Sequence, residues 1–228
     1  MKRWTSIDTA LMPDGKIISL NEHDGSYSIR VDGAELMSTR RSASEAKIAE
    51  LACAHASEIR GARVLIGGLG FGFTLKAALA ALAPDATVIV AEILAAVIAW
   101  NQNPAFNLAA VAISDPRVIL AQKDVADVIR ESPRSFDGIV LDVDNGPTAL
   151  SSAGNHRLYD LEGLQMALAA LRAGGCLAIW SAAPDPAFER LMRRAGFDVE
   201  IERCRAHASS GSWHALFIGR PLPLRKRS

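Results

Sequence analysis

Four glycines within six residues, directly after a short apolar run, constrain the fold of this chain more than any other stretch. The run Val64–Ile66 predicts a buried strand, and residues 74–80 have the composition of a helix. Glycine is costly inside a strand or helix but suits a sharp turn or the close approach of a ligand. Strand, glycine turn and helix together present backbone N–H groups to a ligand. A plain strand-to-helix turn is the alternative interpretation.

The spacing of the glycines argues against a dinucleotide site. The pattern G-x-G-x-x-G, counted from Gly68 or from Gly70, meets Phe73 or Leu75 where its third glycine belongs. The chain has G-x-G-x-G instead, and this pattern resembles the first motif of class I S-adenosylmethionine (AdoMet) binding proteins. The residues expected to hold such a cofactor in this loop are Gly67, Gly68, Leu69, Gly70 and Gly72.

Composition limits the classes of partner. Half of the 228 residues are apolar, and 25 Lys and Arg balance 25 Asp and Glu, so no net charge draws the molecule to nucleic acid or to an anionic membrane. Three cysteines without C-x-x-C spacing indicate buried thiols in a reducing cytosol, and the scattered histidines indicate no metal site. No apolar run reaches about eighteen residues. We therefore predict a cytoplasmic protein with a small-molecule substrate and with no metal, nucleic-acid or membrane partner.

Residues 1–41 predict a small antiparallel β-sheet. Alternating runs at 16–20 and 27–31 flank Asp24-Gly25, which favours a hairpin turn, and residues 34–39 give a third strand. A sheet of this size buries little surface by itself. We expect it to pack on the rest of the chain or on another subunit.

Strands and helices alternate after this region. Ser42 and Glu45 predict a capping box that opens a helix, and a later helix is expected from Tyr159 to Arg172. The expected strands are residues 64–66, 87–91, 118–121, 136–141, 176–180, 199–204 and 215–218. Near-continuous apolar strands between helices predict an α/β fold with a mostly parallel sheet that is covered on both faces.

Four carboxylates stand at or just after the ends of successive strands: Glu92, Asp124, Asp142 and Asp144. Parallel sheets bind their ligands at this edge. Glu92 follows Gly72 by twenty positions, where an acid meets a ribose diol. Asp124 is placed to accept from a purine amine, and Asp142 and Asp144 to hold a cationic amine or remove its proton. For Asp142 and Asp144, a turn or helix-cap role is the alternative.

From about residue 27 to residue 220 the chain resembles the spermidine synthases (polyamine aminopropyltransferases). The matching segments are Val31-Asp32-Gly33, the glycine loop, Glu92, Lys123-Asp124, Asp142 with Gly146-Pro147, and residues 209–218. The resemblance implies a Rossmann-like class I AdoMet-methyltransferase fold, with a seven-stranded, mostly parallel sheet and a small N-terminal antiparallel β-sheet, commonly as a homodimer. It also implies that the glycine loop, Glu92 and Asp124 clasp a nucleoside, with Asp142 as the proton acceptor.

This resemblance gives three segments: an N-terminal β-sheet region at 1–41, a Rossmann-like AdoMet-binding domain at 42–220, and a flexible tail at 221–228. The chain departs from the family at Gly70, where the family's loop has an aspartate that holds the amino group of decarboxylated AdoMet. Asp144 also lies one residue earlier than the family's second aspartate. Other positions of the family's polyamine pocket are replaced here by Leu36, Arg41, Ser42 and Glu45.

These departures favour intact AdoMet over its decarboxylated form. A loop of bare N–H groups accepts the carboxylate of AdoMet, which an aspartate would repel, and Arg41, if it faces the cleft, would repel a polycation. We therefore predict methyl transfer from AdoMet to a small acceptor, with Asp142 and Asp144 as catalytic residues. The alternatives are a divergent aminopropyltransferase that uses decarboxylated AdoMet and a diamine, and a catalytically silent nucleoside-binding homologue. The missing third glycine disfavours an NAD-dependent reductase.

Overall fold

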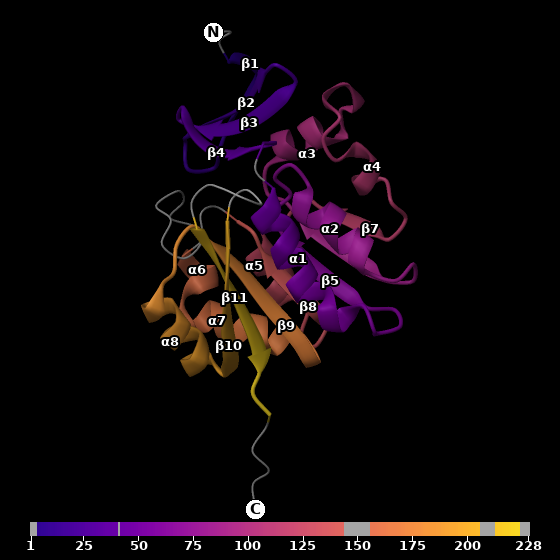
Figure 1. Cartoon of the computed structure of the whole chain (residues 1–228), viewed down its shortest axis with the longest axis vertical. Helices are drawn as coiled ribbons and strands as arrows, with labels where there is room; N and C mark the ends of the chain where they lie inside the picture. The colour runs from indigo at the N-terminus through magenta and orange to yellow at the C-terminus, as the bar shows by residue number, and fades with distance from the viewer. Residues whose placement is uncertain (1–3, 41, 144–155, 206–212, 224–228) are drawn as a thin grey trace, which may run out of the picture.

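A computed structural model describes residues 4–40, 42–143, 156–205 and 213–223. These residues form a large seven-stranded sheet flanked by helices and a smaller four-stranded sheet (Figure 1). All three cysteines are free, and Cys53 and Cys176 are buried. No helix among the described residues is both long enough and apolar enough to cross a membrane.

The large sheet has the strand order β10-β11-β9-β8-β5-β6-β7. Strands β5 to β9 pair in parallel, whereas β11 is antiparallel to both β9 and β10. The strands are β5 (Arg63–Gly67), β6 (Thr87–Ala91), β7 (Val118–Ala121), β8 (Phe136–Leu141), β9 (Leu171–Ser181), β10 (Phe197–Arg205) and β11 (Trp213–Pro221). The chain runs outward from β5 through β6 to β7 and then returns to β8 on the other side of β5. Ligands bind at such a switch point, just beyond the carboxyl ends of the strands.

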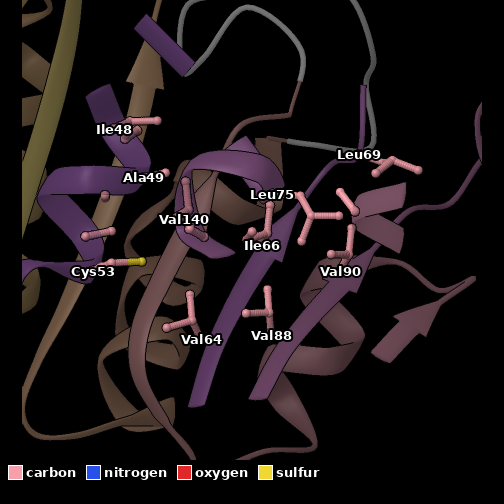
Figure 2. Packing of buried hydrophobic residues seen from close by; sticks show 14 of the residues in the cluster. Ile48, Ala49, Cys53, Val64, Ile66, Leu69, Leu75, Val88, Val90 and Val140 are labelled. Atoms are coloured by element: carbon pink, nitrogen blue, oxygen red, sulfur yellow. The ribbon is translucent and has the colours of Figure 1, made fainter. Parts of the chain in front are cut away.

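Helices cover both faces of this sheet, as the sequence predicts. Alternate residues of β5 point to opposite faces: Val64 and Ile66 pack in one buried cluster with α1 and α2, and Leu65 packs in a second cluster with α5, α7 and α8. Figure 2 shows part of the first cluster, with Ile48 and Cys53 of α1 beside this face of the sheet. The helices are α1 (Ala43–Ala56), α2 (Phe73–Ala81), α3 (Ala95–Gln102), the 3-10 helix η1 (Pro104–Phe106), α4 (Ala110–Ile113), α5 (Val125–Arg130), α6 (His156–Tyr159), α7 (Leu161–Ala170) and α8 (Pro186–Ala195).

The small sheet packs on the main body of the molecule beside α3 (Figure 1). It comprises β1 (Thr5–Leu11), β2 (Ile17–His23), β3 (Ser26–Val31) and β4 (Ala34–Ser38), paired antiparallel in this order. Ile18, Leu20 and Ile29 are buried in the same cluster as α1 and β5, so the two sheets share a core. Trp100 of α3 also donates a hydrogen bond from Nε1 to Asp8 Oδ2 of β1, at 2.7 Å.

Four local expectations differ from the structure. A fourth strand, β1, precedes the three expected in the small sheet. The predicted capping box is wrong, because Ser42 makes no side-chain cap, and Ser44 rather than Ser42 bonds to Glu45. The single helix expected from Tyr159 is divided into α6 and α7, because Asp160 caps a new helix by accepting from the Gly163 N–H at 2.8 Å. Strand β11 ends at Pro221, the first residue of the expected tail.

Candidate active site

A cavity of about 430 Å³ opens at the carboxyl ends of β5, β6, β7 and β8. Gly68, Gly70, Glu92, Asp124 and Asp142 line it together, although they come from separate parts of the sequence. Its volume lies in the range of small-molecule and cofactor sites. Asp144 and Arg41, the other predicted determinants, lie outside the described residues.

The glycine loop follows the shape of the cavity because two of its glycines allow close contacts. Gly68 has a φ of +90°, and a Cβ there would lie 2.5 Å from the backbone oxygen of Asp142. Gly70 has a φ of +50°, and a Cβ there would lie 2.7 Å from Met37 Cε, so Met37 fills the space that a side chain at position 70 would need. Position 70 is therefore a glycine covered by a thioether side chain.

The loop is less bare than predicted. The N–H groups of Gly68, Leu69 and Gly72 donate to Ala91 O at 2.9 Å, to Glu92 Oε2 at 3.0 Å and to Leu69 O at 2.7 Å. These three amides hold the turn itself. The expectation that the whole loop offers free donors to a cofactor carboxylate is therefore wrong for them.

Glu92 holds the loop and faces the cavity. It is only 8% exposed, and its second oxygen, Oε1, accepts from the Leu94 N–H at 2.8 Å. These two backbone donors fix the orientation of the carboxylate at the wall of the cavity. The ribose role of Glu92 stays a prediction.

Asp124 has structural partners that the sequence did not indicate. Its Oδ1 accepts from the Ala126 N–H at 2.8 Å and caps α5, and its Oδ2 forms an ion pair with Arg157 of α6. The residue still lines the cavity. The predicted contact with a purine amine therefore has to share this carboxylate with a helix cap and an arginine.

Asp142 follows β8 and is held over the glycine loop. Its N–H donates to Gly67 O at 3.0 Å, and its Oδ2 accepts from Thr74 Oγ1 at 2.7 Å. Burial, followed by the nearby charge of Glu45, raises the pKa of Asp142 to about 7, against the lowering effect of the Thr74 hydrogen bond. A carboxyl with this pKa is suited to accept a proton near neutral pH.

Glu45, in the first turn of α1, provides a second, half-buried carboxyl in this cavity. Burial raises its pKa as well. Its Oε2 accepts from Ser44 Oγ at 2.6 Å, and Ser44 Oγ lies 3.1 Å from His214 Nδ1. The ring of His214 meets Trp180 edge-on, with 4.7 Å between centroids. Glu45 and Asp142 thus bring two interacting carboxyls to one site.

A second cavity of about 190 Å³ continues beyond Glu45, and we call it the side compartment. Leu36, Met37, Glu45 and Trp180 line both cavities, whereas Glu35, Ser44 and His214 line only the side compartment. The site therefore has room for a donor along the glycine loop and for an acceptor on the far side of the two carboxyls. The small sheet supplies part of the wall of each cavity through β4.

Sequence reasoning gathered Glu92, Asp124 and Asp142 but missed Glu45, Trp180 and His214 as site residues. Glu45 had a signal, because it aligns with a pocket tyrosine of the resembled family. Trp180 had a weaker one, since it lies near the carboxyl end of β9. His214 lies within the matching segment 209–218 but carried no signal of its own, because only the antiparallel direction of β11 brings the start of that strand to the ligand-binding edge. Among the described residues, no group of three or more His, Cys, Asp or Glu side chains is arranged to hold a metal ion.

No protein-family model matches the chain, and no curated protein is significantly similar to it in sequence. Solved structures do match. A spermidine synthase from Thermotoga maritima has a TM-score of 0.74 at 20% identity, covering 96% of this chain and 75% of its own. A spermidine synthase in complex with the transition-state analogue AdoDATO has a TM-score of 0.73 at 20% identity, with coverages of 96% and 74%.

A probable spermidine synthase from Corynebacterium glutamicum has a TM-score of 0.66 at 14% identity, covering 96% of this chain and 81% of its own. All three alignments take in the small N-terminal sheet as well as the large one, since they span nearly the whole chain. Identities this low establish a shared architecture. Over 96% of its length, the chain has the Rossmann-like fold of the spermidine synthases.

Proposed function

We propose that this chain is a spermidine synthase-like transferase that moves the aminopropyl group of decarboxylated AdoMet to an amine acceptor. The observation that carries the proposal is the position of Asp142, which lines the larger cavity together with the glycine loop and Glu45 and has a pKa raised to about 7 by burial and by the charge of Glu45. The likeness to spermidine synthases supports it, and one of these was solved with the transition-state analogue AdoDATO.

The chemistry requires a base at this place. A free alkylamine is protonated at neutral pH, with a pKa near that of lysine, about 10.4. It must lose that proton before its lone pair attacks the carbon next to the sulfonium. The N–C bond then forms, the C–S bond breaks, and its electron pair leaves with sulfur as a neutral thioether. Asp142 is placed to take the ammonium proton, and the two carboxyls attract the cationic acceptor to the site.

This proposal reverses the order of the sequence-based predictions, which favoured methyl transfer. The two half-buried carboxyls of Asp142 and Glu45 suit a cationic amine, and Trp180 adds an aromatic wall that also attracts a cation. The fold likeness points to the same chemistry. The loss of the family's pocket residues is thus offset by Glu45, which the sequence comparison had counted among the losses.

Methyl transfer from intact AdoMet remains a second candidate because of Gly70 and Met37. The ammonium of decarboxylated AdoMet finds no carboxylate at position 70, and Met37 covers that position with an apolar group. A donor held there by backbone groups alone fits AdoMet at least as well.

Thermal shift with decarboxylated AdoMet, AdoMet, methylthioadenosine, S-adenosylhomocysteine and NAD tests the proposal. A nucleoside at 100 times its Kd stabilises the protein by about 2.7 kcal/mol. We expect the largest shift with decarboxylated AdoMet, and loss of the shift in Glu92→Ala but not in Glu58→Ala, an exposed glutamate at the far end of α1. With an amine added, methylthioadenosine should be released.

The outcomes separate the candidates. A larger shift with AdoMet, together with release of S-adenosylhomocysteine, would replace the proposal by the methyl-transfer candidate. Stabilisation by NAD alone, or by none of the five compounds, would refute both transferase functions.

A further inference from the structure

Three side chains form a hydrogen-bonded row across the side compartment, from His214 of β11 through Ser44 to Glu45, which also lines the larger cavity. Glu45 Oε2 lies 2.6 Å from Ser44 Oγ, which lies 3.1 Å from His214 Nδ1. Ser44 is only 1% exposed, and all three residues line the side compartment. Two elements that are far apart in the sequence meet here, since α1 carries two of the residues and β11 the third.

The direction of these hydrogen bonds follows from the number of protons. An ionised Glu45 only accepts, so the single hydroxyl proton of Ser44 must point to it. Ser44 Oγ then has only lone pairs to offer His214, which must donate from Nδ1–H. The hydrogen bond from His214 polarises the Ser44 hydroxyl, which then donates more strongly to the Glu45 carboxylate. A neutral Glu45 allows the reverse direction, with Ser44 donating to Nδ1, so the tautomer of His214 reports the charge of Glu45.

We propose that Ser44 and His214 are positioning residues that keep Glu45 ionised beside Asp142 and thereby make Asp142 a stronger base toward the acceptor. This inference rests on the proposed function. A like charge nearby disfavours ionisation of a carboxyl, so Asp142 holds a proton more tightly while Glu45 is charged. A base whose pKa lies near the working pH removes a proton more effectively than one with an ordinary carboxyl pKa.

Other ionisable groups surround this row of side chains and have to be considered. Asp142 faces Glu45 from β8, and Cys204 of β10 lies close enough for the charge of Glu45 to raise the pKa of its thiol, after burial. Glu202 and Lys47 act on the same thiol in opposite directions. His214 is the register partner of Cys204, and Glu35 of β4 lines the same compartment. None of these groups supplies the short contact that Ser44 makes with Glu45.

The first test needs no activity. The ¹⁵N shifts of the His214 ring distinguish the Nδ1–H from the Nε2–H tautomer, and we expect Nδ1–H above pH 7 in the wild-type protein. Ser44→Ala should lose that preference, and Ser57→Ala, which removes a hydroxyl at the opposite end of α1, should keep it. An Nε2–H tautomer in the wild-type protein would overturn the inference.

The second test is the pH dependence of kcat. In Ser44→Ala and His214→Leu, Glu45 becomes neutral more easily and no longer raises the pKa of Asp142. The acidic limb of the kcat profile should therefore move to lower pH by about one unit, and the maximal kcat should fall about tenfold. His214→Asn, which keeps an N–H near the position of Nδ1, should restore much of both. An unmoved acidic limb in Ser44→Ala, with donor binding retained in thermal shift, would refute the inference.

Failure of the proposed function looks different. A wild-type protein that neither binds the nucleosides nor releases methylthioadenosine removes the proposed reaction, whereas the His214 tautomer still decides whether the hydrogen-bonded row runs toward Glu45.

Discussion

Asp142 owes its chemistry to its surroundings rather than to its residue type. An exposed aspartate is fully ionised at neutral pH, but this one follows a wholly buried strand and faces a second carboxyl. Burial and the charge of Glu45 act in the same direction, and Thr74 acts against them through its hydrogen bond. Each of these three causes can be changed separately by substitution.

Asp142→Asn should alter the pH dependence of stability with a defined sign. Below about pH 4 the carboxyl is protonated in both states and costs nothing. Between pH 4 and 7 the unfolded chain releases this proton and the folded chain keeps it, because its folded pKa is raised to about 7, so wild-type stability falls as the pH rises. Urea unfolding should therefore show the variant gaining on the wild type from pH 4 to pH 8. A constant difference would contradict the raised pKa.

Activity in the same variant should fall at least about 100-fold, since the base is gone. Thr74→Val keeps Asp142 and should shift its pKa upward. It removes the hydrogen bond that lowers the pKa of Asp142, so the acidic limb of kcat should move to higher pH, the reverse of the shift expected for Ser44→Ala.

Gly68 and Gly70 should respond differently to alanine. At Gly68 the new Cβ meets the backbone oxygen of Asp142 at 2.5 Å, which moves only if the end of β8 moves. At Gly70 it meets the flexible end of Met37, so the main cost is the left-handed backbone, about 1–2 kcal/mol. We expect Gly68→Ala to be the more destabilising in urea unfolding and the more damaging to kcat. Adding Met37→Ala should relieve Gly70→Ala, and equal costs at both glycines would contradict these contacts.

At the scale of elements, a single hydrogen bond joins β1 to α3. Trp100 Nε1 donates to Asp8 Oδ2 at 2.7 Å, beside a register shift between Ser6 and Asp8. The turn after β1 carries Met12 and Pro13, which form one edge of the larger cavity. The attachment of β1 therefore bears on the site, although Asp8 lies outside it.

Trp100→Phe keeps an aromatic ring in the core and removes this donor. We expect a loss of about 1.5–3 kcal/mol in the free energy of unfolding, the usual range for a hydrogen bond to a charged group. Hydrogen exchange should rise in β1 and its turn, and the Kd for the donor should increase. Glu58→Ala, an exposed change just beyond the far end of α1, is the control. Unchanged exchange in β1 would show that its pairing with β2 suffices to hold it.

For the whole molecule, the large sheet was predictable and the small one only in part. Residues 87–91, 118–121 and 136–141 are expected strands that coincide with β6, β7 and β8, because buried parallel strands leave continuous β-branched and apolar runs. Strand β1 leaves no such run: its residues are exposed apart from half-buried Ala10, and pairing with β2 holds it. A buried strand can be recognised from its apolar sequence, whereas an edge strand held by backbone pairing has no such sequence pattern.

The residues of the candidate site were also predictable only in part. Carboxylates at strand ends were found because the edge of a parallel sheet gathers them by a general rule. Their partners were not, because Ser44 and His214 are 170 residues apart and only the path of the antiparallel strand brings them together. The predicted homodimer and the roles of residues 144 and 41 stay predictions.

Strand β4 of the small sheet contributes to both cavities of the site. Leu36 and Met37 are neighbours on β4, and both line the two cavities. A substitution in this strand therefore changes the recognition of donor and acceptor together, and the two preferences of the protein are not free to evolve independently. Relatives that exchange one substrate for another would be expected to show the exchange first in these few residues, far in sequence from Asp142.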